Sequence, residues 1–345
     1  MKRLFYTVFA LTALVLSSCS NKVDLYCDEG ETTVVYAMLD ASADTNFFKI
    51  THSFIGNVTE LAQNYEANNY KYDEIEVKFT GKFEGGSTQT LTLDTISKWI
   101  PYDPTSVFYS GCYQTYYYTT KKLIEGEEYK LEVLRKADGV VISSKVNTIN
   151  NFKYKKPIEN MTVTFTDVTT STTTLEWNVP TAPFFSTASY FEAVGFFHYT
   201  ELQPGAQDTV HRSLKWSLGS GEASDLLNTS SNLPYYVITY TPSALFSLLE
   251  NDEYLRNNSP LGVQRWFEKF EFRITAVGED LYNYYLIANS SSAIQDVPNY
   301  SNIDNGTGIM SSRITKSQRN KIAERTRNKI AERFPAYNFI VDPNR

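Results

Sequence analysis

The chain has 345 residues and a formal net charge of −7, and it contains 25 tyrosines and 21 phenylalanines. An acidic chain lacks the basic stripe that nucleic-acid binding requires, so we expect no nucleic-acid partner. Abundant aromatic residues with a modest charged fraction of 21% favour strands over helices, and the length predicts two domains.

The first 18 residues have the pattern of a bacterial signal peptide. Two basic residues precede an apolar run at 4–16, which is shorter than the roughly 20 residues that a membrane-spanning helix needs. The sequence Leu-Ser-Ser-Cys19 at its end resembles a lipobox, in which the cysteine thiolate takes the lipid. We therefore predict removal of residues 1–18, lipidation of Cys19 and a tether at 19–30.

The lipid is the predicted anchor to the outer membrane, on its cell-surface or its periplasmic face. Loss of Lys2 and Arg3 with the signal peptide leaves 30 basic and 39 acidic residues, a net charge of −9. That charge argues against membrane adhesion through basic residues.

Short strands fill the next segment, and we predict an N-terminal β-sandwich domain at 31–152. Gly85-Gly86 and Ala137-Asp-Gly139 are turn signals that predict two hairpins. The predicted strands lie at 33–39, 47–54, 74–79, 88–93, 128–134 and 140–146.

A second series of strands predicts a C-terminal β-rich domain at 153–312. The strand that ends in Leu-Glu-Trp177 resembles the core-tryptophan strand of fibronectin type III-like domains. Thr241-Pro242 starts a helix, and 279–288 is a second short helix. The predicted strands lie at 161–165, 173–177, 190–199, 211–218 and 267–277. The expected fold is mainly β, with two sandwich domains of the fibronectin III or immunoglobulin-like kind and a few short helices in the C-terminal half.

The heptapeptide Arg-Asn-Lys-Ile-Ala-Glu-Arg occurs at 319–325 and again at 327–333. Two copies are too few for a solenoid. Its composition predicts that 313–345 is a helical, basic tail. A solvated helix is the favoured interpretation, and a basic binding patch is the alternative.

No residue pattern indicates catalysis or a metal. The chain lacks a nucleophile elbow, a phosphate-binding loop and a dinucleotide fingerprint, and His52, His198 and His211 lack metal-ligand spacing. We therefore expect no enzyme activity, no cofactor and no metal. In an oxidising compartment Cys27 and Cys112 either pair or remain free thiols.

A tyrosine cluster is the strongest candidate for ligand binding. Tyr113, Tyr116, Tyr117 and Tyr118 would stack on sugar rings or meet a protein partner if they are exposed. Aromatic residues in strands are more often core or cross-strand partners, and this alternative stays open.

Two other motifs are shorter. The sequences Asp-Thr95-Ile and Asp-Thr209-Val match the O-glycosylation motif of Bacteroidetes. The segment 302–306 could supply oxygen ligands to calcium, but it lacks the spacing of a calcium loop. We favour a turn in which Gly306 and Gly308 accept positive φ.

Four segments together resemble a Bacteroidetes lipoprotein family, domain of unknown function 4249. They are Val34–Asp40, Phe48–Phe54, Phe272–Tyr285 and Ser301–Ile309. The sequence departs from the family pattern at Thr307 and Met310, which stand where the family has an apolar and an aromatic residue.

Members of that family are commonly encoded beside TonB-dependent outer-membrane transporters. The resemblance therefore implies a non-enzymatic accessory lipoprotein that binds a ligand for such a transporter or docks to it. It carries over no catalytic residues. The alternatives are an adhesin or surface-structural lipoprotein of the fimbrial type, and a hydrolase whose site the sequence hides.

Overall fold

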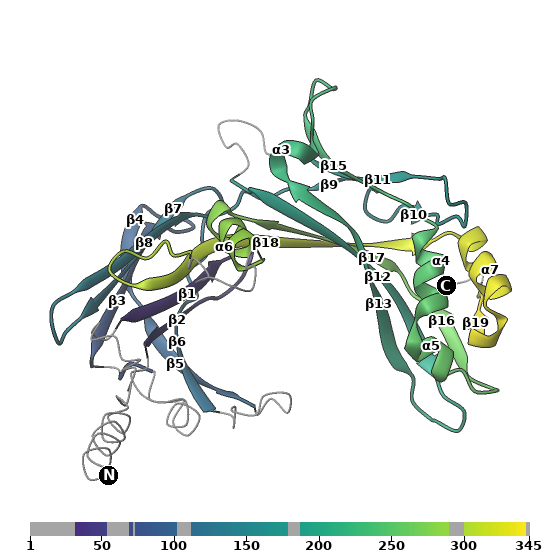
Figure 1. The fold of residues 1–345 in the computed structure, drawn as a ribbon, viewed down its shortest axis with the longest axis horizontal. Helices are drawn as coiled ribbons and strands as arrows, with labels where there is room; N and C mark the ends of the chain where they lie inside the picture. The colour runs from purple at the N-terminus through teal and green to yellow at the C-terminus, as the bar shows by residue number, and fades with distance from the viewer. Residues whose placement is uncertain are drawn as a thin grey trace, which may run out of the picture.

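Two β-rich bodies and one strand that they share make up the molecule. The computed structural model describes residues 32–53, 69–71, 73–101, 112–178, 187–289 and 300–342. Figure 1 shows the N-terminal body, formed by strands β1 to β8, beside the C-terminal body, formed by β9 to β19, with the long strand β18 (Thr307–Ile322) running through both. The expectation of a mainly β chain is confirmed.

The N-terminal body consists of two sheets packed face to face. In one, β1 (Thr33–Leu39), β2 (Asn46–His52), β6 (Cys112–Thr119) and β5 (Asp94–Ile100) are neighbours in that order. In the other, the order is β4 (Thr88–Thr92), β3 (Ile75–Lys82), β7 (Glu128–Arg135) and β8 (Val141–Asn147). Both predicted hairpins, β3–β4 and β7–β8, are confirmed.

Alternating side chains explain why these strands form. Ile75, Val77 and Phe79 of β3 are buried, whereas the side chains between them are partly exposed. Phe79 meets Phe48 of β2 across the core, with ring centroids 4.9 Å apart. Burying each such side chain stabilises the fold by roughly 1.5–3 kcal/mol.

The C-terminal body also has two layers. Its large sheet contains β12 (Tyr190–Leu202), β13 (Val210–Glu222), β16 (Gln264–Phe267), β17 (Phe270–Val277), β18, β19 (Phe339–Ile340) and β10 (Thr162–Val163). Its small sheet contains β14 (Leu227–Asn228), β15 (Tyr235–Tyr240), β11 (Thr173–Asn178) and β9 (Tyr154–Lys156). Trp177, Phe191 and Tyr236 pack together between the two sheets.

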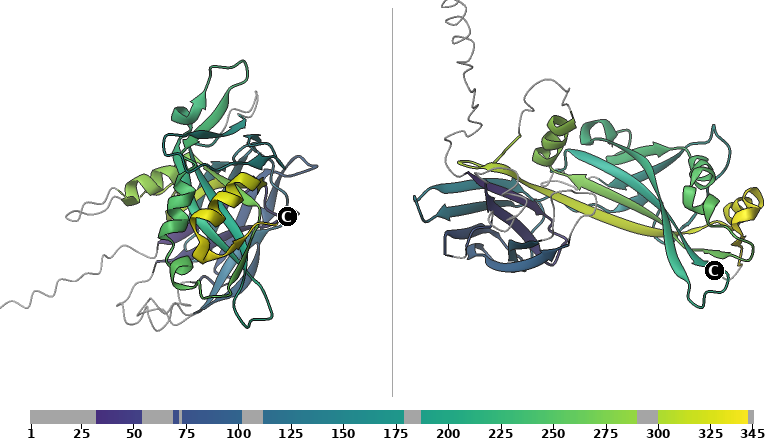
Figure 2. Two further views of the ribbon diagram at one scale, coloured as in Figure 1. Left: turned by 90° about the vertical axis from the view of Figure 1, so that its right-hand side faces the viewer. Right: turned by 60° about the horizontal axis from the view of Figure 1, so that its bottom comes forward.

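Strand β18 joins the bodies because it has a different partner along each half. Residues 307–312 pair in parallel with β1, and residues 313–320 pair antiparallel with β17. One continuous sheet therefore passes from the N-terminal body into the C-terminal body. The right-hand view in Figure 2 shows this strand running to helix α7 (Glu324–Arg333) at the far end.

The described helices are short, and all lie on the C-terminal body except the one at 279–289, which packs at the junction of the two bodies, where Met38 of β1 also lies. They are α3 (Ala223–Leu226), α4 (Ala244–Asn251), α5 (Glu253–Asn257), α6 (Glu279–Asn289), α7 and the 3-10 turn η2 (Pro335–Tyr337). The predicted helix at 279–288 is confirmed as α6. Helix α4 begins at Ala244, three residues after the predicted start at Thr241. The residues between them form a turn in which the amide of Ala244 donates to Thr241 O. Within the described residues, no helix is long and apolar enough to cross a membrane.

The prediction of a helix across both heptapeptide copies is wrong for the first copy. Residues 319–322 of the first copy end strand β18 and only its last two residues enter helix α7, whereas the whole second copy, 327–333, lies in α7. Asn320 is fully buried in the first copy and donates to the carbonyl oxygens of Ile158 and Met161. Sheet pairing and these buried bonds outweigh the helix propensity of the same residues.

The segment 301–308 closes the sheet junction as a turn. The Asn302 side chain donates to Met310 O and accepts from Met310 N, at 2.7 and 2.9 Å. Asn305 and Gly308 take the positive φ values, 56° and 112°, whereas Gly306 does not. This motif of the family resemblance therefore has a structural role here.

Candidate functional site

A cavity of about 660 Å³ lies between helix α6 and the large sheet of the C-terminal body. Its floor comes from the outward face of that sheet, which we define as the face of β12, β13, β17 and β18 that points away from the small sheet. One side of α6 forms its wall. The sequence can supply this face because alternate residues of a strand point to opposite sides.

Hydrogen bonds from β18 hold α6 against the sheet. The amide of Gly278 donates to Ser312 O at 2.9 Å, and the amide of Leu281 donates to Ser311 Oγ at 3.2 Å. The first turn of α6 carries Glu279 and Asp280, where negative charge favours a helix start. Position and direction of the helix are therefore determined by the sheet beneath it.

Two stacked tyrosines form one side of the cavity. The rings of Tyr190 and Tyr282 lie 4.8 Å apart at 14°. The Tyr190 hydroxyl donates to Ser220 Oγ and the Tyr282 hydroxyl donates to Glu222, both at 2.7 Å. The bond to the Glu222 carboxylate raises the pKa of Tyr282 to about 12. The two hydrogen bonds and the ring stacking hold both side chains against the sheet.

The remaining lining is apolar at the rim and polar on the floor. Tyr285 and Leu286 are 53% and 50% exposed on α6. The Thr275 and Thr315 hydroxyls lie 3.1 Å apart on the sheet. Arg313, which precedes Thr315 by two residues on β18, also lines the cavity. Aromatic and aliphatic walls with a few polar groups are typical of a site that binds a small molecule.

The structure divides the predicted tyrosine cluster between two faces of β6. Tyr117 is only 4% exposed and belongs to the core, so the prediction that it contacts a ligand is wrong. Tyr116 and Tyr118 lie on the other face, with ring centroids 6.3 and 6.2 Å from that of Phe47. Tyr113 is 55% exposed and pairs edge-on with Trp99.

The other predicted positions do not join the α6 cavity. Cys19 and Cys27 lie outside the described residues, and the structure describes only the backbone of Cys112, so the disulfide stays a prediction. Thr209 is exposed between β12 and β13, whereas Thr95 is half-buried in β5.

The histidines of the C-terminal body meet carboxylates rather than one another. His198 Nε2 lies 3.1 Å from Glu271 Oε2, and His211 Nδ1 lies 2.6 Å from Glu268 Oε1. Across the described ranges, no three His, Cys, Asp or Glu residues gather closely enough to hold a metal ion.

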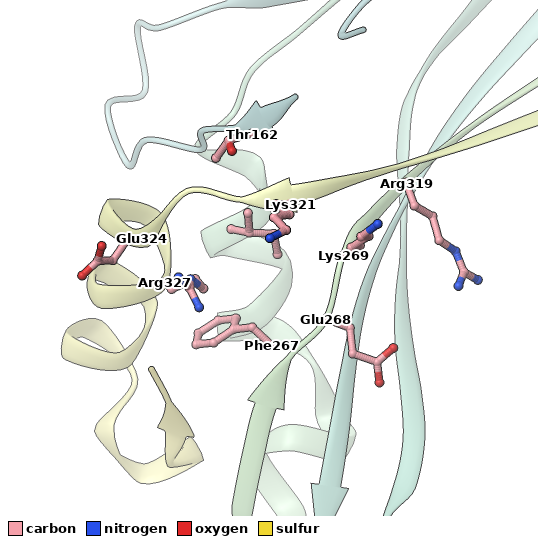
Figure 3. A pocket seen from close by; sticks show the side chains of 9 residues that line it. Thr162, Phe267, Glu268, Lys269, Arg319, Lys321, Glu324 and Arg327 are labelled. Atoms are coloured by element: carbon pink, nitrogen blue, oxygen red, sulfur yellow. The ribbon is translucent and has the colours of Figure 1, made fainter. Parts of the chain in front are cut away.

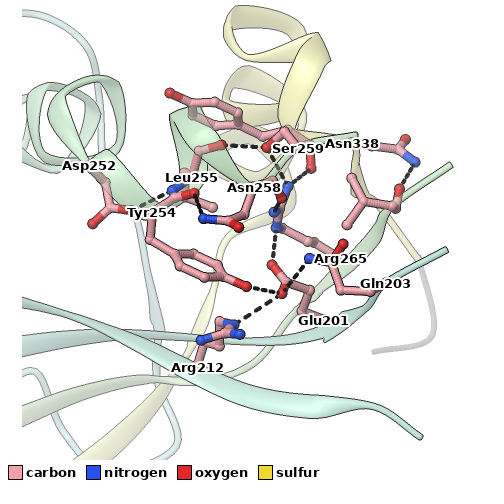
Figure 4. A network of polar contacts seen from close by, with 12 residues as sticks. Glu201, Gln203, Arg212, Asp252, Tyr254, Leu255, Asn258, Ser259, Arg265 and Asn338 are labelled. Atoms are coloured by element: carbon pink, nitrogen blue, oxygen red, sulfur yellow. Dashed lines mark hydrogen bonds and ion pairs between the residues drawn. The ribbon is translucent and has the colours of Figure 1, made fainter. Parts of the chain in front are cut away.

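A buried ion network lies near α5 (Figure 4). Arg265 is fully buried and donates to Glu201, and the carboxylate of Glu201 also accepts from Arg212 and Tyr254. Burial raises the pKa of Glu201, but these hydrogen bonds, with one from Gln203, outweigh it and hold the pKa below its ordinary value. The network joins β12, β13, α5 and β16, and its role is structural.

The sequence predicted the helix that forms the wall of the cavity, but not the cavity itself. Of Leu281, Tyr284 and Tyr285, which helical spacing places on one side of the helix at 279–288, the first and the last line the cavity. Tyr190 and Arg313 were not identified, because strands far apart in sequence bring them to the helix. The family resemblance at 272–285 was the signal that pointed to this place.

The comparison with protein families decides the family. The sequence model of Domain of unknown function (DUF4249) matches residues 21–319. The chain belongs to this family. No curated protein matches the DUF4249 chain in sequence.

Likeness to solved structures is weak. The C-terminal domain of the AgI/II polypeptide BspA from Streptococcus agalactiae is 10% identical with a TM-score of 0.14, and the match covers 84% of this chain and 99% of that one. A further structure, BspA_C_WT, is 9% identical with a TM-score of 0.13 at the same coverage of 84% and 99%.

Proposed function

We propose that this DUF4249 protein is an outer-membrane lipoprotein that binds a ligand for a TonB-dependent transporter, or docks to one, without catalysing a reaction. The observation that carries the proposal is the cavity of about 660 Å³ under α6. Its aromatic rim and polar floor suit the capture of a small molecule. The wall of this cavity, α6, is also part of the segment that resembles the family.

A patch on the N-terminal body supports the docking part of the proposal. Phe47 and Ile96 are 36% and 40% exposed on the outer face of the sheet, beside Tyr116 and Tyr118. The Lys98 ammonium lies 3.8 Å from the centre of the Phe47 ring. Aromatic residues with one cation are typical of a surface that meets a protein partner. We call these five residues the aromatic patch.

The proposal includes a Bacteroidetes origin and membership of both bodies in the fibronectin III or immunoglobulin-like class. Trp177 supports the second point, because it is fully buried between the two sheets of the C-terminal body. Such a position is the one that the core tryptophan of these domains occupies.

A crosslinked pull-down from native membranes tests the transporter partnership. We expect the full, lipidated chain to recover a large β-barrel transporter. The substitution Ile96→Asp places a charge in the aromatic patch and should reduce this recovery. Val141→Asp is the matched control, because Val141 is similarly exposed, at 43%, on β8 of the other sheet.

The outcome that contradicts docking is equally clear. If the pull-down recovers the protein without a transporter, from membranes that contain one, the proposed partnership is contradicted. Equal recovery by the Ile96→Asp and Val141→Asp variants would show that the aromatic patch is not the docking surface.

A further inference from the structure

We propose that a second cavity, at the α7 end of the outward face, binds a small organic anion that carries two or more anionic groups. This cavity has a volume of about 520 Å³ and lies between the end of β18, the β16–β17 connection and the first turn of α7 (Figure 3). Its volume falls in the range of small-molecule sites, roughly 300–1,000 Å³. This proposal rests on the proposed function in one respect, namely that the protein acts by binding. It adds the chemical class of ligand that a second site would take.

The lining is basic although the chain as a whole is acidic. Four basic side chains face two acidic ones, an excess of two positive charges, whereas the net charge of the chain is −7. The basic residues are Lys269, Arg319, Lys321 and Arg327, and the acidic ones are Glu268 and Glu324. A concave surface with one sign of charge concentrates ligands of the opposite sign.

The two acidic side chains do not neutralise the two lysines. The Glu268 carboxylate lies 2.5 Å from Thr200 Oγ1 and 2.6 Å from His211 Nδ1, on the neighbouring strands. Figure 3 shows the carboxylates of Glu268 and Glu324 pointing away from the Lys321 ammonium. Within the part of the chain that the structure describes, neither Lys269 nor Lys321 forms an ion pair. Both ammonium groups therefore suit an anionic ligand.

The arginines are positioned by other contacts and frame the lysines. Arg319 Nε donates to Glu271 at 3.1 Å, and Arg327 Nη1 donates to the carbonyl oxygen of Asp342 at 2.8 Å. Phe267 and Ile322 contribute buried apolar walls. Low polarity beside the cations strengthens their attraction for a bound anion. The apolar walls favour an organic anion over a bare inorganic one.

The heptapeptide duplication builds this cavity. Arg319 and Lys321 of the first copy point to the same side of β18, because residues two apart on a strand share a face. Arg327 of the second copy reaches the cavity from the first turns of α7. Lys329, which corresponds to Lys321 in the second copy, instead pairs with Asp167 at 3.2 Å. The geometry favours the basic binding patch over a solvated helix.

Titration calorimetry on the full lipidated protein in neutral detergent tests the site. The probes are citrate and trigalacturonate, with galactose as the neutral control and inorganic phosphate as the simple anion. We expect one of the two organic anions to bind, more weakly as salt rises, and galactose not to bind. Lys321→Ala should weaken this binding at least tenfold, and Lys329→Ala, the matched control, should leave it unchanged.

Three results would overturn the proposal. The first is no binding of either organic anion by the wild-type protein. The second is equal weakening by the Lys321→Ala and Lys329→Ala variants, and the third is phosphate binding as tight as that of the organic anion. Circular dichroism of both variants establishes that they fold, which is expected because Lys321 and Lys329 are exposed. No transporter is present in this measurement, so its failure is separate from failure of the pull-down.

Discussion

Arg265 shows how a charge is accommodated in the interior of this protein. Its Nε donates to Glu201 at 2.8 Å, and its Nη atoms donate to Ser259 Oγ and to the carbonyl oxygens of Asn258 and Tyr337 at 2.6 to 2.9 Å. A buried charge is tolerated only when such bonds replace water. The guanidinium thereby connects β16 with β12, the two residues that follow α5, and η2.

Substitution of Arg265 by Met should lower the free energy of unfolding by about 3–5 kcal/mol, because Glu201 would keep a buried charge with one partner fewer. Arg212→Met is the control and should cost about 1 kcal/mol, because that side chain is 33% exposed. Denaturant unfolding followed by tryptophan fluorescence measures both. Equal losses in the two variants would contradict the role assigned to Arg265.

Glu271 predicts how stability depends on pH. Burial raises its pKa, but hydrogen bonds from Arg273, His198, Ser317 and Arg319 outweigh this and lower the pKa from 4.5 to about 2. The ionised group therefore contributes stability above about pH 4.5, and the contribution is lost as pH falls towards about 2. Glu271→Gln should be less stable than wild type at about pH 6, and the difference should shrink on acidification. A difference that is constant with pH would contradict this.

At the scale of elements, the sequence pattern predicted the strands and hairpins that neighbouring residues determine. Strand β1 was predicted with its observed bounds, and both hairpins of the N-terminal body were predicted from Gly and Asp-Gly turns. Strand β5 was missed, because its side chains are mostly exposed and show no alternation. Strand β18 was missed because its pairing with β1 joins residues more than 270 positions apart.

The two heptapeptide copies show this limit most directly, because the same four residues, Arg-Asn-Lys-Ile, end a strand at 319–322 and form a helix at 327–330. Ile322 and Ile330, at the same position of the repeat, are both buried, but against different neighbours. The basic cavity could not be predicted for the same reason, since it needs Lys269 from the β16–β17 connection beside the repeat. Of the four tyrosines predicted to contact a ligand, Tyr117 is excluded because its side chain is buried.

Substitution of Gly308 tests how closely strand β18 packs against β1. Its φ is +112°, and a Cβ built there would lie 2.1 Å from Val35 O of β1. Gly308→Ala should therefore separate β18 from β1 and lower the free energy of unfolding by at least about 2 kcal/mol. Gly85→Ala is the control, because its φ is +75° with no atom within 4 Å, and should cost about 1 kcal/mol. Chemical unfolding of both variants measures the difference, and equal costs would contradict the close contact.

At the scale of the whole molecule, the predicted lipid anchor at Cys19 can be tested by membrane fractionation. Cys19→Ala should move the protein from the membrane pellet to the soluble fraction in detergent-free fractionation, because the acyl chains, at about 0.8 kcal/mol per buried CH₂, would be absent. The acidic body should not hold the chain on the membrane by charge. Sedimentation of the variant with membranes would contradict the anchor.

The shared strand has a consequence for how such a protein can evolve. The boundary expected between residues 312 and 313 falls inside β18, at the point where its partner changes from β1 to β17. A recombination event at that point would separate residues 313–322 of β18 from the segment that encodes β17 and leave β17 with an unpaired edge, which invites aggregation. The two bodies should therefore be inherited together, and insertions should accumulate in the loops rather than between the bodies.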